Sequence, residues 1–370
     1  MSKVFHDVYK GKKVIVTGHT GFKGTWLSAW LLSLGADVVG ISNDIPTTPS
    51  MFVELEMEKR VTHYVADIRN LDEIKIIVEK EQPDFIFHLA AQAIVSVSYT
   101  DPVETISTNV IGTMNVLESL RGLKNKCCAI MITSDKCYDN VEWVWGYRET
   151  DALGGKDVYS GSKGAAELVI KSYIHSFFQK EDSSIYIGIS RAGNVIGGGD
   201  WAKDRIVVDC MQAWSEGETV EIRSPNATRP WQHVLEPLSG YLTQGMVLSQ
   251  SDELHGEAFN FGPRAEQNHT VKELLADLSE YWDFNSKDDA YKVIDNIPFY
   301  EAGLLKLNCD KALYHLGWEA NLAYDDTIQF VSEWYYKFYK ENVNLYEFTL
   351  NQIEKYETKA KDKHYTWTIK

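Results

Sequence analysis

The stretch "KKVIVTGHTGFKGTWLSAWLLSLGADVVGIS", residues 12–42, decides the fold. A β-branched run at 12–18 is followed by an amphipathic segment at 22–35, which ends at Gly35, and by a second β-branched run at 36–42. Short β-branched runs favour strands, and apolar side chains at helical spacing between them favour a helix. We therefore predict that a strand, a helix and a second strand open the chain.

The same alternation continues through the first half of the sequence. Strands are predicted within 62–68, 84–91, 127–134 and 184–197, and helices at about 71–82, 107–123 and 159–178. Strands that alternate with helices indicate a parallel sheet with helices on both faces. We therefore predict an α/β fold, a doubly wound parallel (Rossmann) sheet with a smaller C-terminal substrate-binding lobe.

The texture of the sequence changes after Gly199, where tryptophans and prolines break up shorter elements. We assign residues 1–190 to a dinucleotide-binding domain and 191–370 mainly to the substrate-binding lobe. The segment "GEAFNFGP" at 256–263 is strand-like again, so we expect the chain to rejoin the sheet within about 230–263. The aromatic tail at 333–348 predicts a packed helix.

Composition excludes several classes of protein. The 370 residues carry a formal net charge of -16, which argues against binding nucleic acid, because that requires a basic surface. The five cysteines lack metal-ligand spacing, so we expect no metal site. Their odd number indicates reduced thiols and therefore a cytoplasmic location. No apolar stretch approaches the ~20 residues of a membrane span, so we expect no membrane partner.

The segment "TGHTGFKG" carries Gly18, Gly21 and Gly24 between the first strand and the first helix. Glycine permits a tight turn there, brings the backbone close to a pyrophosphate and leaves the helix amides free for phosphate oxygens. The candidate cofactor-binding residues of this turn are Gly18, Thr20, Gly21, Phe22, Lys23 and Gly24.

Two acidic positions bear on the adenosine half of a dinucleotide. The second strand ends at Ser42, where folds that prefer NAD usually place an acid, and Asp44 follows two residues later. This displacement leaves the choice between NAD and NADP open. Asp67, followed by Ile68, comes after the third strand, where an acid can meet the adenine amino group. A helix N-cap is an equally good interpretation of Asp67.

The segment "YSGSK" places Tyr159 and Lys163 one turn apart on a helix. Lys163 can lower the pKa of the Tyr159 phenol, ordinarily ~10, so that tyrosinate acts as a base. Ser134, in the sheet-end segment "TSD", would hold the substrate oxygen. A lone Tyr and Lys at this spacing is a weak signal, but together with the glycine turn and "TSD" it is specific.

These segments together resemble the extended short-chain dehydrogenase/reductase family, and within it the CDP-D-glucose 4,6-dehydratases, over essentially the full length. The matching segments are "VTGHTGFKG", "HLAAQ", "TSDKCYDN", "YSGSK", "SRAGNVIGGGDWA" and "ATRPWQHVLEPLSGY". The resemblance implies NAD as cofactor, CDP-D-glucose as substrate, and a homodimer or homotetramer that pairs through the helices around 109–120 and 159–178. It adds cofactor contacts from Leu89, Ala90, Ala91, Gln92, Asn109, Thr133, Tyr159 and Lys163.

The resemblance also implies a reaction, in which the sugar is oxidised at C4 by NAD, loses water across C5 and C6, and regains the hydride at C6. Tyr159 would take the proton of the 4-hydroxyl, and the product would be CDP-4-keto-6-deoxy-D-glucose, used for 3,6-dideoxyhexoses of O-antigen. Dehydratases acting on dTDP- or GDP-sugars usually carry Asp-Glu after the serine, whereas this chain has Asp135 and Lys136. We expect Asp135 to act as the acid at C6 and Lys136 as the base at C5, facing different atoms of the sugar.

Cations for the substrate diphosphate must be supplied locally in so acidic a chain. Arg191 and Asn194 follow a strand, and Arg205 and Arg229 come later. Arginine forks suit diphosphate oxygens. By resemblance Arg229 is the first candidate, Asn194 the second and Arg205 the third, and a structural salt bridge is an equal alternative for any one arginine.

Three alternatives stay open at this stage. A dTDP- or GDP-sugar dehydratase would share the scaffold, and a 4-epimerase or simple dehydrogenase would need Ser134, Tyr159 and Lys163 but no acid and base after the serine. A non-catalytic dinucleotide-binding regulator is disfavoured because that triad is complete. Trp231 and His233 are interpreted as packed structural residues.

Overall fold

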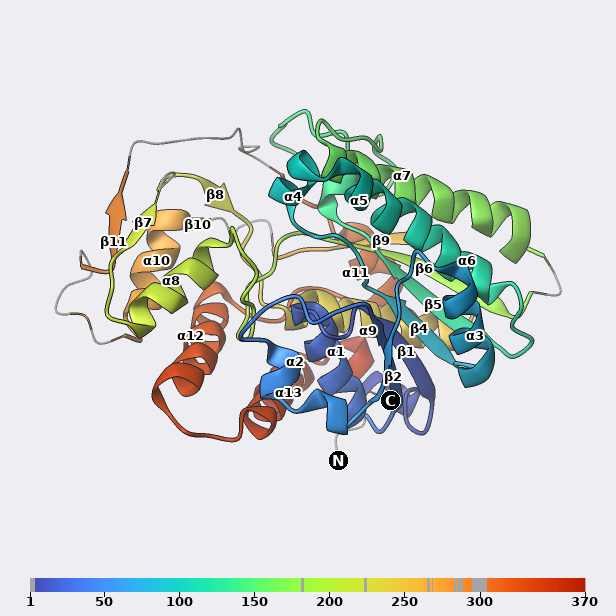
Figure 1. Cartoon of the computed structure of the whole chain (residues 1–370), viewed down its shortest axis with the longest axis horizontal. Helices are drawn as coiled ribbons and strands as arrows, with labels where there is room; N and C mark the ends of the chain where they lie inside the picture. Colours follow the sequence, from blue (N-terminus) through green and yellow to red (C-terminus); the bar gives the residue numbers. More distant parts are fainter. Residues whose placement is uncertain are drawn as a thin grey trace.

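The structure, a computed structural model of the whole chain, describes residues 4–180, 183–222, 225–264, 267, 269–282, 284, 289–294 and 305–369. At its centre is a seven-stranded sheet in the order β3-β2-β1-β4-β5-β6-β9 (Figure 1). Every neighbouring pair in this sheet is parallel. The predicted doubly wound parallel sheet is confirmed.

The strands of the sheet follow the predicted segments. They are β1 (Lys13–Thr17), β2 (Asp37–Ser42), β3 (Thr62–Val65), β4 (Phe85–His88), β5 (Cys127–Ile132), β6 (Ile185–Ala192) and β9 (Ala258–Phe261). The chain runs outward from β1 to β3 and then returns to β4 on the other side of β1. Such a reversal opens a crevice at the carboxyl ends of β1 and β4, where ligands of open α/β sheets bind.

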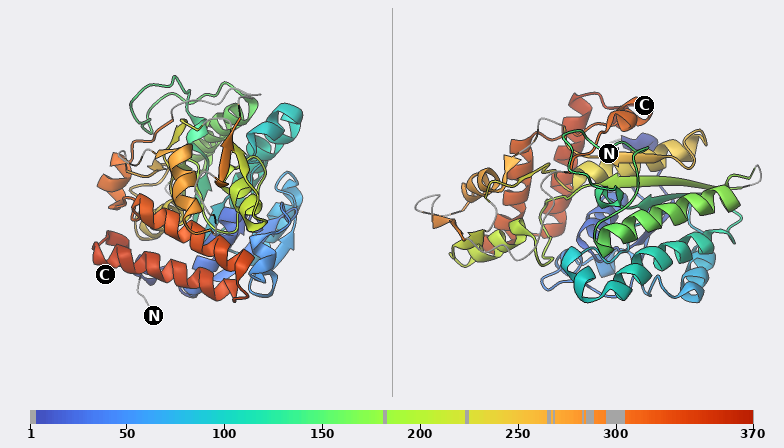
Figure 2. Two further views of the ribbon diagram at one scale, coloured as in Figure 1. Left: turned by 90° about the vertical axis from the view of Figure 1, so that its left-hand side faces the viewer. Right: turned by 90° about the horizontal axis from the view of Figure 1, so that it is seen from above.

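Both faces of the sheet are buried, which explains why its strands are apolar throughout. Val14 and Val16 point into one hydrophobic core, and Ile15 between them points into the other. Figures 1 and 2 show α3 (Leu71–Glu81), α6 (Thr113–Leu120) and α7 (Val158–Tyr173) on one face, and α1 (Phe22–Ser33) and α9 (Leu235–Gln250) on the other.

Some helices differ from the sequence prediction. The predicted helix at 107–123 begins as a π-helical segment, η3 (Ser107–Gly112), and α7 ends in another, η5 (Ile174–Phe178). Between β2 and β5, three short helices were not predicted: α2 (Met51–Glu54), α4 (Val95–Thr100) and α5 (Pro102–Ile106). The aromatic tail lies in two helices, α12 (Tyr324–Lys340) and α13 (Leu345–Asp362), because Asn344 caps the second by accepting a hydrogen bond from the Glu347 amide.

The segments after β6 form a smaller lobe beside the sheet (Figure 2). It contains α8 (Ile206–Ser215), α10 (Val271–Ser279), α12 and two small sheets, in which β7 (Val220–Ile222) pairs with β11 (Tyr291–Val293) and β8 (Thr228–Arg229) pairs with β10 (His269–Thr270). α11 (Asp310–Leu316) contacts β9, whereas α13 returns to α1.

The two ends of the chain lie together (Figure 1). The turn η1 (Val4–Asp7) contacts η7 (Thr366–Thr368), and the Phe5 ring stacks on Trp367 with ring centroids 4.8 Å apart. Among the residues that the structure describes, no helix has both the length and the apolar character that crossing a membrane requires.

Candidate active site

Two glycines of the turn between β1 and α1, Gly18 and Gly24, are packed too tightly to carry a side chain. Gly18 has a φ of +73°, and a Cβ there would lie 2.8 Å from the Ala90 amide nitrogen. A Cβ on Gly24 would lie 2.1 Å from the Gly18 carbonyl oxygen. Gly21 caps α1 without a side-chain hydrogen bond. The backbone therefore presents first-turn amides at the crevice, in the arrangement that binds phosphates at helix N-termini.

The end of β2 carries a hydroxyl that is already hydrogen-bonded. Ser42 is buried, and its Oγ lies 2.9 Å from His19 Nδ1 and accepts a bond from the Thr20 amide at 3.4 Å. His19 Nε2 lies 2.7 Å from His63 Nδ1, and burial, then the His63 charge, lowers the pKa of His19 to about 4. The Asp44 side chain is exposed, and only its carbonyl accepts from Thr20, at 2.7 Å. The Ser42 hydroxyl and the exposed Asp44 carboxylate therefore leave the choice between NAD and NADP open.

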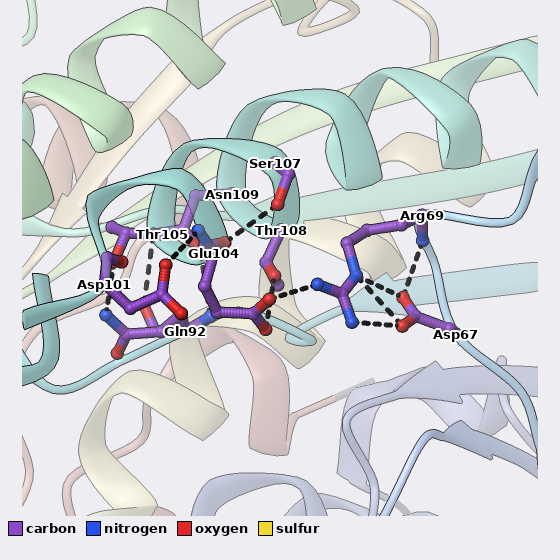
Figure 3. A network of polar contacts seen from close by, with 9 residues as sticks. All are labelled: Asp67, Arg69, Gln92, Asp101, Glu104, Thr105, Ser107, Thr108 and Asn109. Carbon is purple, nitrogen blue, oxygen red and sulfur yellow. Dashed lines mark hydrogen bonds and ion pairs between the residues drawn. The ribbon is translucent and has the colours of Figure 1, made fainter.

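Asp67 is held by an arginine rather than by a helix (Figure 3). Its carboxylate accepts from the Arg69 amide at 2.8 Å and pairs with the Arg69 guanidinium at 2.5 Å, which keeps the pKa of Asp67 below its usual range. Arg69 also pairs with Glu104. The N-cap interpretation of Asp67 is wrong, because Asn70 caps α3 through the Glu73 amide. Asp67 and Arg69 line an open depression of about 690 Å³.

The loop after β4 is fastened to the neighbouring helices (Figure 3). Asn109 accepts from the Gln92 amide at 2.9 Å and donates to the Gln92 carbonyl at 3.1 Å and to Ser162 Oγ at 2.9 Å. Gln92 Nε2 donates to Thr105 at 2.7 Å. The buried Asn109 side chain therefore joins this loop to α7. Of the other predicted cofactor contacts, Ile68 is buried after β3, and Leu89, Ala90 and Ala91 are half-buried after β4.

The predicted catalytic residues meet where β5 ends. Ser134 caps the short turn η4 (Asp135–Cys137), accepts from the Lys136 amide at 3.2 Å and donates to the Asp135 carboxylate at 3.0 Å. Tyr159 lies in the first turn of α7, where the Ser134 hydroxyl acts on its phenol, and Lys163 Nζ lies 5.9 Å from the centroid of the Tyr159 ring. The structure thus brings together two segments that are about two dozen residues apart in the sequence.

Burial controls the protonation of this group. It raises the pKa of Tyr159 to about 12, with a further contribution from Asp135 and opposition from the Ser134 hydrogen bond. Burial also lowers the pKa of Lys163 to about 8. Loss of solvent thus outweighs the Ser134 hydrogen bond and the Arg205 charge, which both lower the pKa of Tyr159. That Lys163 lowers this pKa for catalysis stays a prediction.

Asp135 and Lys136 do not neutralise each other. Asp135 is buried and Lys136 is half-buried, and no ion pair joins them in the described part of the chain. A Cβ on Gly193 would lie 3.3 Å from Asp135 Oδ2, so the end of β6 passes next to this carboxylate. Burial, then the Arg205 charge, lowers the pKa of Lys23 to about 8 against the attraction of Asp135. The glycine turn, the catalytic segment and the lobe therefore meet here.

Arg191 and Arg205 each pair with a carboxylate. Arg191 is fully buried and pairs with the equally buried Glu167 at 2.6 Å, so the salt-bridge alternative holds for Arg191. Arg205 pairs with Asp200 at 2.6 Å but stays partly exposed. The charge of Arg205 also acts on Tyr159 and Lys23, which places it at the candidate site.

The remaining substrate candidates lie on the lobe side. Asn194 is exposed just after β6, and Arg229 is half-buried on β8, where its Nη1 donates to the Thr228 carbonyl at 3.0 Å. Trp231 and His233 are buried, and burial lowers the pKa of His233 to about 3. Their interpretation as packed structural residues is confirmed.

Gln232 is a polar residue of this region that sequence reasoning missed. It is buried, and its Oε1 has no hydrogen-bond partner among the described residues. Its Nε2 lies 4.0 Å from the place that a Cβ on Gly193 would take, next to Asp135. Its position between two structural residues, Trp231 and His233, gave no signal in the sequence.

Metal and disulfide chemistry find no support in the residues described. No group of three or more His, Cys, Asp or Glu side chains could hold a metal ion in the described ranges. All five cysteines are free thiols.

Several known proteins share this architecture. The chain is 44% identical over 334 residues to CDP-glucose 4,6-dehydratase of Salmonella typhimurium, covering 89% of this chain and 92% of that one. It is 25% identical to CDP-paratose 2-epimerase of Salmonella typhi, covering 87% and 98%. Among solved structures, dTDP-glucose 4,6-dehydratase of Streptomyces venezuelae with NAD and TYD bound matches with a TM-score of 0.73 and 19% identity, covering 88% and 97%.

The family assignment rests on a match of much greater extent than any one motif. A family model described as GDP-mannose 4,6 dehydratase matches residues 15–331, from β1 to the middle of α12. This range includes the glycine turn, the Ser134 segment, Tyr159, Lys163 and the lobe. The chain therefore belongs to the GDP-mannose 4,6-dehydratase family.

Proposed function

We propose that this protein is an NAD-dependent CDP-D-glucose 4,6-dehydratase, a hydro-lyase that forms CDP-4-dehydro-6-deoxy-D-glucose and water. The observation that carries the proposal is the 44% identity, over 89% of the chain, to the Salmonella enzyme of that name. The pair Asp135 and Lys136 after Ser134 supports it further, because an epimerase needs no acid and base at this place.

The glycine turn fits a dinucleotide. Side chains on Gly18 or Gly24 would clash with backbone, and the first-turn amides of α1 are directed to the crevice between β1 and β4. Asp67 at the end of β3 would hold the adenine, and the segment 89–92 would line the nicotinamide side. NAD, when bound there, would supply hydride-transfer chemistry at C4 and C6 of the sugar.

Tyr159 and Ser134 act on the 4-hydroxyl of the sugar. Ser134 holds this oxygen, and Tyr159 withdraws its proton as C4 is oxidised. Since burial raises the pKa of Tyr159 to about 12, the tyrosinate depends on nearby cations, and Lys163 and Arg205 are the two that the structure brings to the phenol. Lys163 thus acts by stabilising the charge that forms on Tyr159.

Asp135 and Lys136 divide the elimination between them. The 4-ketone acidifies the proton at C5, which Lys136 abstracts, while Asp135 protonates the departing 6-hydroxyl. A proton returns to C5 as C6 is reduced, so the net loss from the sugar is one water. Two features support separate targets: Asp135 is turned to Ser134, with its second oxygen toward Gly193, and the two side chains form no ion pair in the described structure. Lys136→Met should therefore abolish solvent exchange at C5 but retain oxidation at C4.

The lobe supplies contacts for the nucleotide diphosphate. Arg229, Asn194 and Arg205 are the proposed ligands, and Gln232 is proposed to contact the sugar, because its buried carbonyl oxygen lacks a partner among the described residues. An arginine fork matches a diphosphate and would offset the acidic character of the chain.

A homodimer is proposed through the outer helices. Exposed apolar side chains gather on α4, α5, η3 and α7, and the largest exposed fractions are those of Val103 at 75%, Tyr99 at 66% and Leu168 at 58%. The same helices pack against one another and lie side by side (Figure 1). A second copy of the chain would bury this surface. The free thiols support a cytoplasmic location.

The function is tested with purified protein, NAD and each of four nucleotide sugars: CDP-glucose, dTDP-glucose, GDP-mannose and UDP-glucose. The 4-keto-6-deoxy product is detected by its near-ultraviolet absorbance in alkali and identified by mass spectrometry. We expect product with CDP-glucose. Product only with another nucleotide, or a C4 epimer without loss of water, would replace the proposal by a sister dehydratase or by a 4-epimerase.

A further inference from the structure

A buried ion pair lies directly beneath the candidate catalytic residues. Glu167 and Arg191 are both 0% exposed, and two bonds join them, from Arg191 Nε to Oε1 at 2.7 Å and from Nη2 to Oε2 at 2.6 Å. The desolvation of such a pair is costly, and pairs of this kind add little to stability compared with apolar packing. Stability alone therefore does not account for this pair.

The pair is hydrogen-bonded on every side to the catalytic segment. Glu167 Oε1 accepts from Thr133 Oγ1 at 2.6 Å, and Thr133 directly precedes Ser134. Arg191 Nη1 donates to Tyr138 Oη at 2.8 Å, and Tyr138 directly follows η4. The two ends of the segment that carries Ser134, Asp135 and Lys136 are thus attached to one ion pair.

The same pair is attached to the other two catalytic elements. Glu167 is one turn beyond Lys163 on α7, about 6 Å along the helix axis, and two turns beyond Tyr159. Arg191 lies on β6, two residues before Gly193, which passes next to Asp135. Any rotation of α7 that moved Tyr159 or Lys163 would break a bond to Glu167.

We propose that Glu167 and Arg191 are positioning residues of the active site, which lock α7 against β5 and β6 so that Tyr159 and Lys163 face the oxygen held by Ser134. Neither residue touches the substrate. The inference rests on the proposed dehydratase function, and it adds that the two charges must balance, because either one left alone would act on the Tyr159 phenol through a dry interior.

Other charged groups surround these residues and enter the test. Tyr159 is faced by Asp135 from η4, Arg205 from the segment before α8, and Asp157 and Lys163 from α7, and the ion pair is faced by Cys137, Tyr138 and Glu149. All of them are unchanged in the variants below, so a change in pH dependence reports the altered charge.

The experiment compares Glu167→Gln, Arg191→Gln and the double variant by steady-state turnover of CDP-glucose across pH. We expect kcat to fall about 10- to 100-fold in each single variant with KM within about threefold, the cost of a small misplacement of reacting groups. Glu167→Gln leaves a cation, which stabilises tyrosinate, so the acid limb of the kcat profile moves to lower pH. Arg191→Gln leaves an anion and moves that limb to higher pH, and the double variant returns it to the wild-type position.

Glu236→Gln is the matched control. Glu236 is another buried carboxylate, on α9, where it accepts from the Asn321 and Leu322 amides and from Tyr356 in the C-terminal part of the chain. This variant should lose thermal stability without a change in kcat or in the pH profile. If Glu167→Gln behaves in the same way, the pair is structural only and the inference is overturned.

Thr133→Val covers the case in which the charge variants do not fold. It removes the side-chain hydrogen bond to Glu167, and because Thr133 is also an expected cofactor contact, NAD affinity is titrated alongside. We expect unchanged NAD affinity and a smaller fall in kcat, again with little change in KM. Wild-type kcat in a folded Thr133→Val protein, with no folded charge variant, would overturn the inference. A wild-type protein that forms no product from CDP-glucose would instead refute the proposed function, whatever the variants do.

Discussion

The cofactor end of the molecule, at the glycine turn, and the substrate end, at the arginines of β6 and the lobe, differ in how their geometry is determined. At the cofactor end, the residues of the glycine turn are neighbours in the sequence. Gly18 is required by the backbone at Ala90, after the adjacent strand β4, and Gly24 by the Gly18 carbonyl. At the substrate end, the arginines follow one another in similar contexts, yet Arg191 is buried with Glu167 and Arg205 is paired with Asp200.

The difference shows that a sequence motif predicts local backbone geometry but does not predict side-chain partners. A turn fixes its own backbone, so its spacing alone predicts its geometry. The role of an arginine depends on which carboxylate the fold brings to it, and Glu167 is 24 residues from Arg191 in the sequence. Ser134 and Tyr159 lie between the two ends and combine both cases. Each stands in a recognisable local segment, but only the folded sheet brings the two segments together.

The largest effect is expected at Tyr159, which lies between the two ends. Tyr159→Phe removes the group proposed to withdraw the 4-hydroxyl proton, so kcat for CDP-glucose should fall by about 10²- to 10⁴-fold, the usual contribution of general acid-base catalysis. KM should change little. Tyr173→Phe, on the same helix and half-buried, is the control and should keep wild-type kcat. Equal activity of the two variants would remove Tyr159 from the mechanism.

The fold was more predictable than the site, because strands and helices follow from local sequence pattern whereas the site depends on contacts between distant residues. Strand positions such as Ile15 between Val14 and Val16 follow from local apolar character, and the helix that carries Tyr159 and Lys163 follows from its spacing. The break between α12 and α13 depends on one capping hydrogen bond at Asn344, which an aromatic-rich segment concealed.

Side-chain partners were the part that the sequence could not supply. Asp67 was equally consistent with an N-cap, and the choice was made by Arg69, which turns back onto it, and by Asn70, which takes the cap. The rise in the pKa of Tyr159 could not be predicted, because it comes from burial, a property of the whole fold. Gln232 gave no signal because only its enclosure makes an unpaired amide oxygen notable.

The next largest effect should come from the cofactor end. Gly24→Ala introduces a Cβ 2.1 Å from the Gly18 carbonyl oxygen, and the backbone must shift to admit it, at a cost of about 1–3 kcal/mol in the free energy of unfolding. Calorimetric titration should show weaker NAD binding, because the shift displaces the turn. Gly161→Ala is the control: nothing lies within 4 Å of its Cβ, so stability and NAD affinity should be retained.

An effect of intermediate size is expected at the substrate end. Arg229→Gln should raise KM for CDP-glucose about 10- to 100-fold, the value of one or two charge-assisted bonds to a diphosphate, while NAD affinity is unchanged. Arg264→Gln removes another lobe arginine, which pairs with Glu319 at 2.9 Å, and should leave KM as it is. If both variants raise KM alike, the effect is one of net charge and not of a specific contact.

The smallest effect concerns the acid that the sequence placed two residues beyond the end of β2. Asp44→Asn should change the affinities for NAD and NADP by less than about threefold each, because the carboxylate is exposed and a solvated charge contributes little. The structural role of Asp44 lies in its carbonyl, which accepts from Thr20 and survives the substitution. Titration of both dinucleotides checks this, and a large gain in NADP affinity would show that the carboxylate repels the 2′-phosphate after all. In that case the cofactor end would share the property of the substrate end, a side chain whose role is fixed by what it meets rather than by where it stands in the motif.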